Sequence, residues 1–434
     1  MNIVLFTPTV KKSAIARMAH LISHELFAQG HAITIIQTEA KHLFGTDTFN
    51  FGTPIIHWTN TDQVTEAVAL ADACIYQIGN CYEFHQGGLH WLPQYPGIVC
   101  LHDFFLGGIF LEWAKSDYTQ AKLILHQWYE PIIANQFFTL TCPEPFTEKT
   151  RNTAPMIEWI ASMALGVITH SNWGCDRIMR ACPGPIRTVP LPYNAPGIAL
   201  TLQKKASTFQ NKFQILTIGH VNTNKRIDSV IQAIGENADL RQHTIYRLVG
   251  EIKPAIANKL STLAQKYNVN LIISGEVEDT VLAQAITDSD VICCLRWPSL
   301  KAASASAIEA MLYGAAIIVT NTGFYKEIPN TCALKINPDN EIADLSAALD
   351  LLFKNPAQRK AMGIQAQQWA EKTFTSQNYV ENIIDLIEIT MKTQVSLNAI
   401  HYFCNIMHQW STTSDFLNQE NIIHPLNLFN LKNT

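Results

Sequence analysis

The alternation of short apolar runs with helix-forming segments is the feature that most constrains the fold of this chain. Residues 3–6 form one such run and residues 213–219 another, and each is followed by a polar loop and then a helical segment. The stretch 189–211, which contains several prolines, separates the two halves of the pattern. Because strands that alternate with helices pair in parallel, each half predicts an α/β domain with a doubly wound parallel sheet.

We therefore expect two Rossmann-like domains that face each other across a cleft, followed by a helical tail. The predicted division places the first domain at residues 1–195, the second at 196–385, and the tail, packing back on the domains, at 386–434. The tail carries more large apolar side chains than water would tolerate. They are Tyr402, Phe403, Trp410, Phe416, Leu426 and Phe429. Packing on the domains or on a partner is one outcome, and peripheral membrane contact is the other; the lack of a basic stripe disfavours the second.

The composition is that of a globular protein without affinity for nucleic acid. A chain of 434 residues is long enough for two hydrophobic cores, and 47% hydrophobic with 15% charged residues argues against disorder. The formal net charge is -5, and Lys and Arg form no extended block. The sequence thus lacks the basic footprint of a nucleic-acid-binding protein.

Cysteine usage and the N-terminus predict a cytoplasmic protein. The ten cysteines show no C-x-x-C spacing, and Cys293 and Cys294 are neighbours on a predicted buried strand, where they cannot bridge each other. We expect them to be reduced. No apolar run reaches the ~18 residues of a membrane span, and the N-terminus lacks the basic start and cleavage site of a signal peptide.

Residues 298–329 predict an anion-binding site at the start of a helix. Ala303, Ser304 and Ala305 form a loop of small residues that opens the helical run 304–313, and Gly314 ends that run before a β-branched strand. The first N–H groups of a helix lack internal partners and carry partial positive charge, so a diphosphate can bind there when no bulky side chain intervenes.

Glu309 lies about one and a half turns into this helix. Its carboxylate can accept hydrogen bonds from two neighbouring hydroxyls, such as those of a ribose. The alternative is a solvated surface glutamate, which is the commoner fate of a lone carboxylate on a helix.

A second strand–glycine–helix segment precedes this site. The strand 213–219 ends on Gly219, and the loop from His220 leads to Lys225 and Arg226 at a predicted helix start. Cations are disfavoured at helix N-termini but suit a site that must neutralise phosphates. An ordinary exposed basic pair is the alternative.

Three strands of the N-terminal half end on polar residues that we expect to face the cleft, because ligands bind beyond the carboxyl ends of parallel strands. One leads to Asn80 and His85, the next to His102 and Asp103, and a third to His170. His102 can exchange a proton near neutral pH, and Asp103 can orient it or bind sugar hydroxyls. A satisfied loop histidine is the alternative for His102.

The segment 298–329 resembles the donor motif of the retaining glycosyltransferases of family 4, in the GT-B superfamily of glycosyl transferases group 1. That motif has two glutamates separated by seven residues. Glu309 matches the second, which holds the ribose, residues 303–305 match the small loop at the diphosphate, and Lys301 stands at the first, which contacts the transferred sugar. The resemblance implies a GT-B fold and a hexosyltransferase-type enzyme of glycan biosynthesis that needs neither a metal nor a cofactor. Its partners would be a nucleoside-diphosphate sugar as donor and an acceptor of unknown class, which could be a glycan, a lipid, a protein or a small molecule.

Lys301 is a departure from the motif, since a lysine donates hydrogen bonds whereas a glutamate accepts them. Three outcomes remain open: an altered donor sugar, an ammonium that takes over part of the diphosphate charge, or loss of catalysis. We expect retained activity with altered donor preference. The alternatives are an inactive sugar-nucleotide or glycan-binding protein and a GT-B nucleotide-sugar epimerase.

The resemblance extends to shorter segments. It implies diphosphate contacts for Gly219, His220 and Lys225, and backbone contacts to the base for Glu276 and Val277. The loop with Ser13 and Ala14, which lacks a G-x-G-x-x-G fingerprint, resembles the family's first acceptor-side loop. It also implies an acceptor side for the segments that carry Asn80, His85 and His170, and a catalytic group of His102, Asp103 and Lys301.

Overall fold

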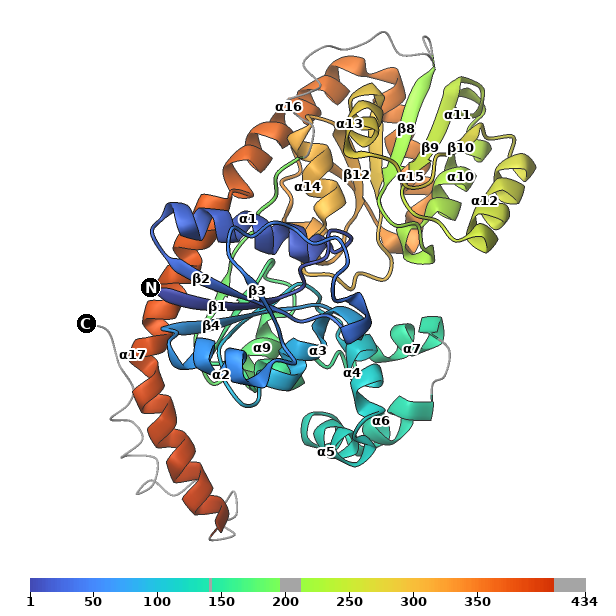
Figure 1. Cartoon of the computed structure of the whole chain (residues 1–434). Helices are drawn as coiled ribbons and strands as arrows, with labels where there is room; N and C mark the ends of the chain where they lie inside the picture. The colour runs from blue at the N-terminus through green and yellow to red at the C-terminus, as the bar shows by residue number, and fades with distance from the viewer. Residues whose placement is uncertain (140–142, 196–211, 410–434) are drawn as a thin grey trace.

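The computed structural model describes residues 1–139, 143–195 and 212–409 and shows two α/β domains (Figure 1). In the first domain the strands are β1 (Asn2–Thr7), β2 (Ala32–Gln37), β3 (Ile55–His57), β4 (Ala73–Ile78), β5 (Ile98–Leu101), β6 (Gly166–Thr169) and β7 (Ile186–Thr188). In the second they are β8 (Phe213–Ile218), β9 (Thr244–Val249), β10 (Leu271–Ile273), β11 (Val291–Cys294), β12 (Ala316–Thr320) and β13 (Ala333–Ile336).

Helices connect these strands. Those of the first domain are α1 (Ala14–Ala28), α2 (Thr61–Ala69), α3 (Tyr82–Trp91), α4 (Gly107–Ala114), α5 (Tyr118–Trp128), α6 (Pro131–Gln136), α7 (Pro143–Thr150), α8 (Ile157–Ala161) and α9 (Cys175–Ala181). Those that follow β8 are α10 (Ile227–Glu236), α11 (Ala238–His243), α12 (Pro254–Lys266), α13 (Asp279–Asp288), α14 (Ala305–Leu312), α15 (Glu341–Lys354), α16 (Pro356–Thr373) and α17 (Ser376–Gln409).

Both sheets are parallel and have the same strand order relative to their own first strand. The first sheet runs β3-β2-β1-β4-β5-β6-β7 and the second β10-β9-β8-β11-β12-β13. Strands such as β1 and β12 are apolar on both faces and buried on both, as parallel strands covered by helices must be. The prediction of two doubly wound parallel sheets is confirmed. Each chain reversal, between β1 and β4 and between β8 and β11, creates a crevice at the carboxyl ends of the strands.

The two domains are joined near these crevices by backbone hydrogen bonds. The N–H of Phe104 donates to the carbonyl of Leu300 at 2.9 Å, and the N–H of Ala302 donates to the carbonyl of His102 at 3.0 Å. Asp103 and Lys301 thus form an isolated antiparallel bridge between the domains. This contact places the loop after β5 directly under the loop that precedes α14.

Helix α17 leaves the second domain and crosses the first, where it packs on α1, β6 and β7 (Figure 1). An ion pair between Arg187 and Asp385, 3.1 Å long, fastens it there. The predicted boundary at 385/386 falls inside this helix, and the one at 195/196 lies at the edge of the described residues, so the domain division stays a prediction. Of the tail aromatics, Tyr402 is 71% exposed, and Trp410, Phe416 and Phe429 lie outside the described residues.

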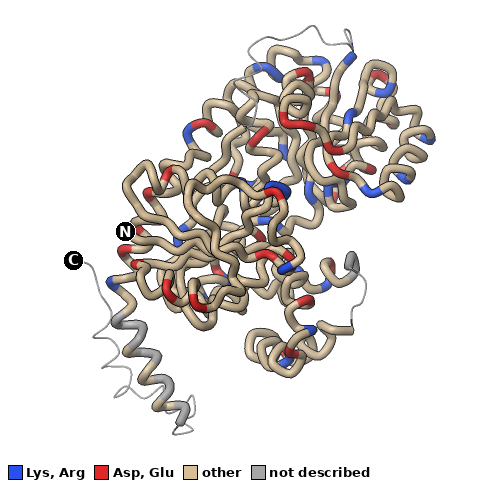
Figure 2. The backbone as a smooth tube through the Cα atoms, in the orientation of Figure 1, with Lys and Arg blue, Asp and Glu red and all other residues tan. Residues whose placement is uncertain are grey.

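Among the described residues, no helix is both long and apolar enough to cross a membrane. Basic and acidic residues are interspersed over both domains (Figure 2). The eight cysteines whose side chains are described form no disulfide bond with one another. The expected cytoplasmic location stays a prediction.

Candidate functional site

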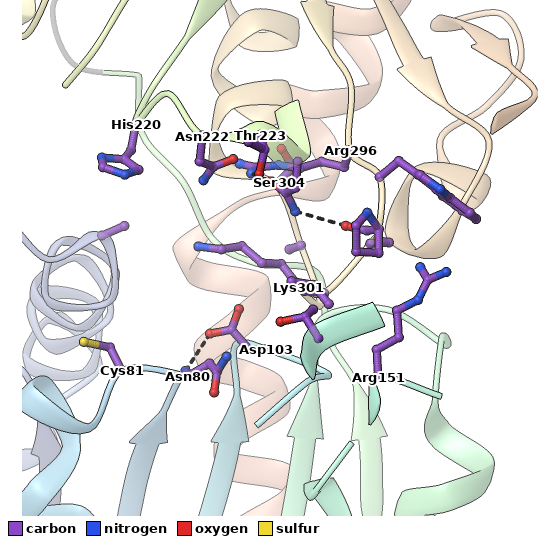
Figure 3. Close-up of a pocket in the computed structure, with 18 of the residues that line it drawn as sticks. Asn80, Cys81, Asp103, Arg151, His220, Asn222, Thr223, Arg296, Lys301 and Ser304 are labelled. Carbon is purple, nitrogen blue, oxygen red and sulfur yellow. Dashed lines mark hydrogen bonds between the residues drawn. The ribbon is translucent and has the colours of Figure 1, made fainter. Parts of the chain in front are cut away.

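A cavity of about 1080 Å³ lies between the domains, where the loops after β1, β4 and β5 face the loops after β8 and β11 (Figure 3). Ten of the residues predicted from the sequence line it: Ser13, Ala14, Asn80, His85, Asp103, His220, Arg226, Lys301, Ala303 and Ser304. The rule that ligands meet the carboxyl ends of strands thus located this cavity.

The N-terminus of α14 faces the cavity. Ser304 is the N-cap, and its Oγ accepts a hydrogen bond from the N–H of Ala307 at 3.3 Å. The hydroxyl of Tyr325 donates to the same Oγ at 3.0 Å, which holds the cap in place. Ala305 begins the helix but does not line the cavity. The predicted helix start is confirmed, with small residues at the opening.

Two cations stand beside this helix start, and Asn224 orients one of them. Arg296 follows β11, and its Nη1 donates to Oδ1 of Asn224 at 2.8 Å. Asn224 also donates from Nδ2 to the carbonyl of Pro298 at 3.0 Å and accepts from the N–H of Trp297 at 2.9 Å. Lys301 is exposed and extends into the cavity between Ser304 above and Asp103 below (Figure 3). Arg296 and Lys301 therefore supply the cavity with positive charge next to the amides of α14.

Lys225 and Arg226 are each bonded to an acceptor of the protein itself, and their contact with a diphosphate stays a prediction. Lys225 is buried outside the cavity lining, and its Nζ donates to the carbonyl of Ile218. Burial, followed by the charge of Arg296, lowers the pKa of Lys225 to about 7. Arg226 lines the cavity but is paired at 2.8 Å with the buried Glu341. The expectation of a free basic pair is wrong because both cations are committed to the protein's own acceptors.

Gly219 and His220 mark the turn after β8. Gly219 has φ of +84°, a left-handed conformation that suits glycine, and this lets the chain turn sharply from the strand. Gly219 itself does not line the cavity, whereas His220 does, with its Nδ1 3.4 Å from Glu251. Glu276 and Val277 lie near this end but outside the lining. Their contact with a nucleotide base stays a prediction.

Glu309 is buried and does not line the cavity. The hydroxyl of Tyr193, which belongs to the segment between the domains, donates to its Oε2 at 3.1 Å. Burial raises the pKa of Glu309 to about 7. The alternative of a solvated surface glutamate is therefore wrong. A ribose could reach this carboxylate only after Tyr193 has moved.

The buried position of Glu309 predicts a dependence of stability on pH. Because its folded pKa is raised above that of the unfolded chain, stability falls as pH rises from about 4.5 to about 7 and remains reduced above. Glu309→Gln removes this charge and should increase the free energy of unfolding by roughly 1–3 kcal/mol at about pH 8, with little effect at about pH 4. Urea titrations at both pH values measure it. The matched change Glu66→Gln on the exposed face of α2 should be neutral, and an equal gain in both variants would contradict the assignment.

The N-terminal side of the cavity is a hydrogen-bonded polar loop set. Oδ2 of Asp103 accepts from the N–H of Asn80 at 2.8 Å, and Oδ1 of Asn80 accepts from the N–H of Ile109 at 2.9 Å (Figure 3). His85 accepts from the N–H of Gly79 at 3.1 Å, and burial lowers the pKa of this imidazole to about 3. Ser13 caps α1 by accepting from the N–H of Ala16 at 3.2 Å. These hydrogen bonds hold the loops in place, and Asp103 lies beside Lys301 through the backbone bridge between the two residues.

His102 and His170 lie beneath the cavity rather than in it. The Nε2 of His102 is 2.6 Å from Oε1 of Gln77, and the two imidazoles are 4.8 Å apart. Burial, followed by the charge of His170, lowers the pKa of His102 well below its usual range, and burial lowers that of His170 to about 4. The expectation that these histidines face the cleft is wrong. Both are neutral near pH 7 because the loss of hydration disfavours the charged imidazolium.

The sequence interpretation missed Arg296 and Arg151, which also line the cavity. Arg296 follows the carboxyl end of β11, so the rule that selected Asp103 would have found it. Arg151 directly follows α7, and no local sequence pattern predicts that it lines a cavity. Among the described residues, no group of three or more His, Cys, Asp and Glu side chains is arranged to hold a metal ion.

Two parallel-sheet domains that face each other across this cavity define the GT-B class of fold. Residues 200–369 match the family model described as Glycosyl transferases group 1. This match agrees with the group that the motifs resemble. No curated protein matches the chain at a significant level.

Solved structures with this fold cover 89–92% of the chain. Sucrose-phosphate synthase from Thermosynechococcus elongatus is 14% identical with a TM-score of 0.59, covering 92% of this chain and 100% of that one. HepE from Anabaena, in complex with UDP, is 14% identical with a TM-score of 0.60, covering 89% and 100%. A glycosyltransferase from Rickettsia africae is 14% identical with a TM-score of 0.61, covering 90% and 98%. Together with the family match, these neighbours support a glycosyltransferase enzyme.

Proposed function

We propose that the protein transfers a hexose from a nucleoside-diphosphate sugar to an acceptor bound on the N-terminal side of the cavity. The observation that carries the proposal is the N-terminus of α14, which opens into the cavity beside Arg296 and Lys301. Unpaired first-turn amides and two cations form a site for a diphosphate. HepE, which has the same fold, binds UDP and UDP-glucose, so uridine nucleotides are the first donors to test.

We further propose that transfer retains the anomeric configuration and needs no bound metal, in keeping with the resemblance of residues 298–329 to the family 4 donor motif. When the bond between the sugar and the diphosphate breaks, negative charge grows on the leaving oxygen. Arg296, Lys301 and the α14 amides lie where they stabilise that charge. Asp103, held by the N–H of Asn80, offers a carboxylate to the hydroxyls of a bound sugar.

The proposal is tested with a panel of nucleotide sugars in two assays. A donor that binds only the folded protein must raise its apparent stability, so thermal unfolding identifies the base and the sugar. Release of the nucleoside diphosphate then measures hydrolysis or transfer, and the anomeric configuration of the product reports retention. If no nucleotide sugar of the panel raised the unfolding temperature, the proposed function would be contradicted.

Lys301 provides a sharper test of donor preference. Lys301→Glu restores the carboxylate of the resembled motif but places it beside Asp103, so the native donor should lose about tenfold or more in affinity. Turnover with the native donor should fall in parallel, as measured by release of the nucleoside diphosphate. Lys326→Glu, at an exposed lysine that does not line the cavity, is the matched control and should change neither quantity.

A non-catalytic sugar-nucleotide-binding protein is the second candidate. Two observations favour it. Lys301 stands at the position of the sugar-contacting glutamate in the resembled motif, and the hydroxyl of Tyr193 donates a hydrogen bond to the carboxylate of Glu309. Turnover decides between the two functions. Nucleotide binding without turnover in the native protein, combined with turnover in Lys301→Glu, would establish the second candidate.

A further inference from the structure

The cavity carries more positive charge than its own carboxylates neutralise. Its lining contains six basic residues, Lys12, Arg151, Arg226, Lys259, Arg296 and Lys301, and two carboxylates, Asp103 and Glu148. Arg226 is paired with Glu341 at 2.8 Å. Within the described ranges, the other five basic residues form no ion pair with a carboxylate. The cavity is therefore built to receive anionic ligands.

These cations lie at different places, so a single diphosphate does not account for all of them. Arg296 and Lys301 stand beside the start of α14, where the proposed donor diphosphate lies. Arg151 comes from the N-terminal domain, and its side chain rises to the right of Lys301 toward the second domain, on the other side of Lys301 from His220 (Figure 3). Lys301 extends away from Arg151 in the same view. Arg151 thus belongs to the acceptor side of the cavity.

The guanidinium of Arg151 packs over an aromatic ring and, among the described residues, forms no ion pair with a carboxylate. Its central carbon lies 4.7 Å from the ring centroid of Trp297, which belongs to the other domain. Trp297 is itself fixed by its N–H bond to Asn224. Stacking sets the plane of a guanidinium while leaving its N–H edge available for two parallel bonds to a carboxylate or phosphate. Nε of Arg151 is buried and has no hydrogen-bond partner among the described residues.

The backbone around Arg151 is equally well defined. Its N–H donates to the carbonyl of Thr147 at 3.0 Å and continues the turn of α7. The next residue, Asn152, is anchored through its carbonyl by Arg177. Burial lowers the pKa of Arg151, and the charge of the exposed Glu148, the other carboxylate of the lining, raises it, but within the described residues the two side chains form no ion pair. A preorganised donor group without an acceptor is the signature of a binding site for an anion.

We infer that the acceptor carries a phosphate or carboxylate group and that Arg151 binds this group through paired N–H···O bonds. The inference rests on the proposed function, because it assigns Arg296 and Lys301 to the donor. It names the class of acceptor: an anionic sugar or sugar-like molecule.

The test distinguishes binding at the acceptor site from binding at the donor site by filling the donor site with a nucleotide first. Full-length protein saturated with UDP is titrated calorimetrically with glucose 6-phosphate, glucuronate and neutral glucose. We expect the two anionic sugars to bind about tenfold tighter than glucose, and this preference to weaken as salt is added. Arg151→Gln should remove the preference while leaving UDP affinity unchanged. Lys149→Gln, at an exposed position of α7, should alter neither the preference for anionic sugars nor the UDP affinity.

Each other outcome is decisive as well. Equal binding of glucose and the anionic sugars, or an undiminished preference in Arg151→Gln, overturns the inference, and a loss of UDP affinity in Arg151→Gln assigns Arg151 to the donor instead. Arg151→Lys keeps the charge without the planar fork and should show an intermediate preference, which covers the case of a glutamine variant that does not fold. If the native protein binds no nucleotide of the panel, the proposed function fails, and the same titrations without nucleotide decide the role of Arg151 separately; if it binds another nucleoside diphosphate, that nucleotide replaces UDP.

Discussion

Replacing Arg296 by methionine is expected to weaken binding of the nucleotide donor about tenfold to a hundredfold while the fold persists. Arg296 lies beside the start of α14, and Asn224 holds its guanidinium at 2.8 Å. A hydrogen bond to a charged group contributes about 1.5–3 kcal/mol. Methionine keeps the aliphatic packing of the arginine stem but removes the charge. Calorimetric titration with UDP measures the loss.

Arg180→Met is the matched control, because Arg180 is exposed on α9 and does not line the cavity. It should bind UDP as the native protein does. Asn224→Ala leaves the charge of Arg296 in place but frees its orientation, so a smaller loss is expected. Unchanged UDP affinity in Arg296→Met would mean that the diphosphate does not lie beside α14, and the donor site would have to be assigned elsewhere.

Replacing Gly363 by alanine is expected to destabilise the protein by roughly 3 kcal/mol, although alanine favours helices. A Cβ at Gly363 would lie 2.1 Å from the carbonyl oxygen of Gly314, the residue at which the chain leaves α14 for β12. The carbonyl oxygen belongs to the backbone and cannot rotate away as a side-chain atom would, so α16 would have to move away from α14 and β12. Urea unfolding measures the change in free energy.

The control for this change is Gly88→Ala in α3. There the nearest atom to the added Cβ is the side-chain terminus Cδ1 of Ile78, 3.1 Å away, which can shift at small cost. The free energy of unfolding should change by less than about 1 kcal/mol. Similar losses in both variants would show that the effect arises from glycine content rather than from the close approach of α16 to Gly314.

Local pattern predicted the elements that line the site with good accuracy. The helix expected at residues 304–313 is α14, with Ser304 as its cap, and Gly314, with φ of +69°, ends it. The loops after β4, β5 and β8 contain Asn80, Asp103 and His220 in the cavity. These predictions held because the periodicity of apolar residues and the chemistry of caps act over a few neighbouring residues.

Predictions that concerned the direction of single side chains held less well. Lys225 turns back to the carbonyl of Ile218, and Glu309 is covered by Tyr193 from the segment between the domains. His102 points to Gln77 instead of the cavity. In each case the partner is distant in sequence or belongs to the backbone, and an element-by-element interpretation contains no information about it.

By itself, the sequence determined the two parallel sheets, the order of their elements and the loops at which a ligand could bind, because hydrophobic periodicity and strand-end chemistry are local properties. Only the tertiary structure decided which charges are free. It paired Arg226 with Glu341, left Arg296 and Lys301 open beside α14, and brought Arg151 against Trp297 from the opposite domain. Electrostatic interactions depend on distance through space and on burial, and neither quantity exists until the chain has folded.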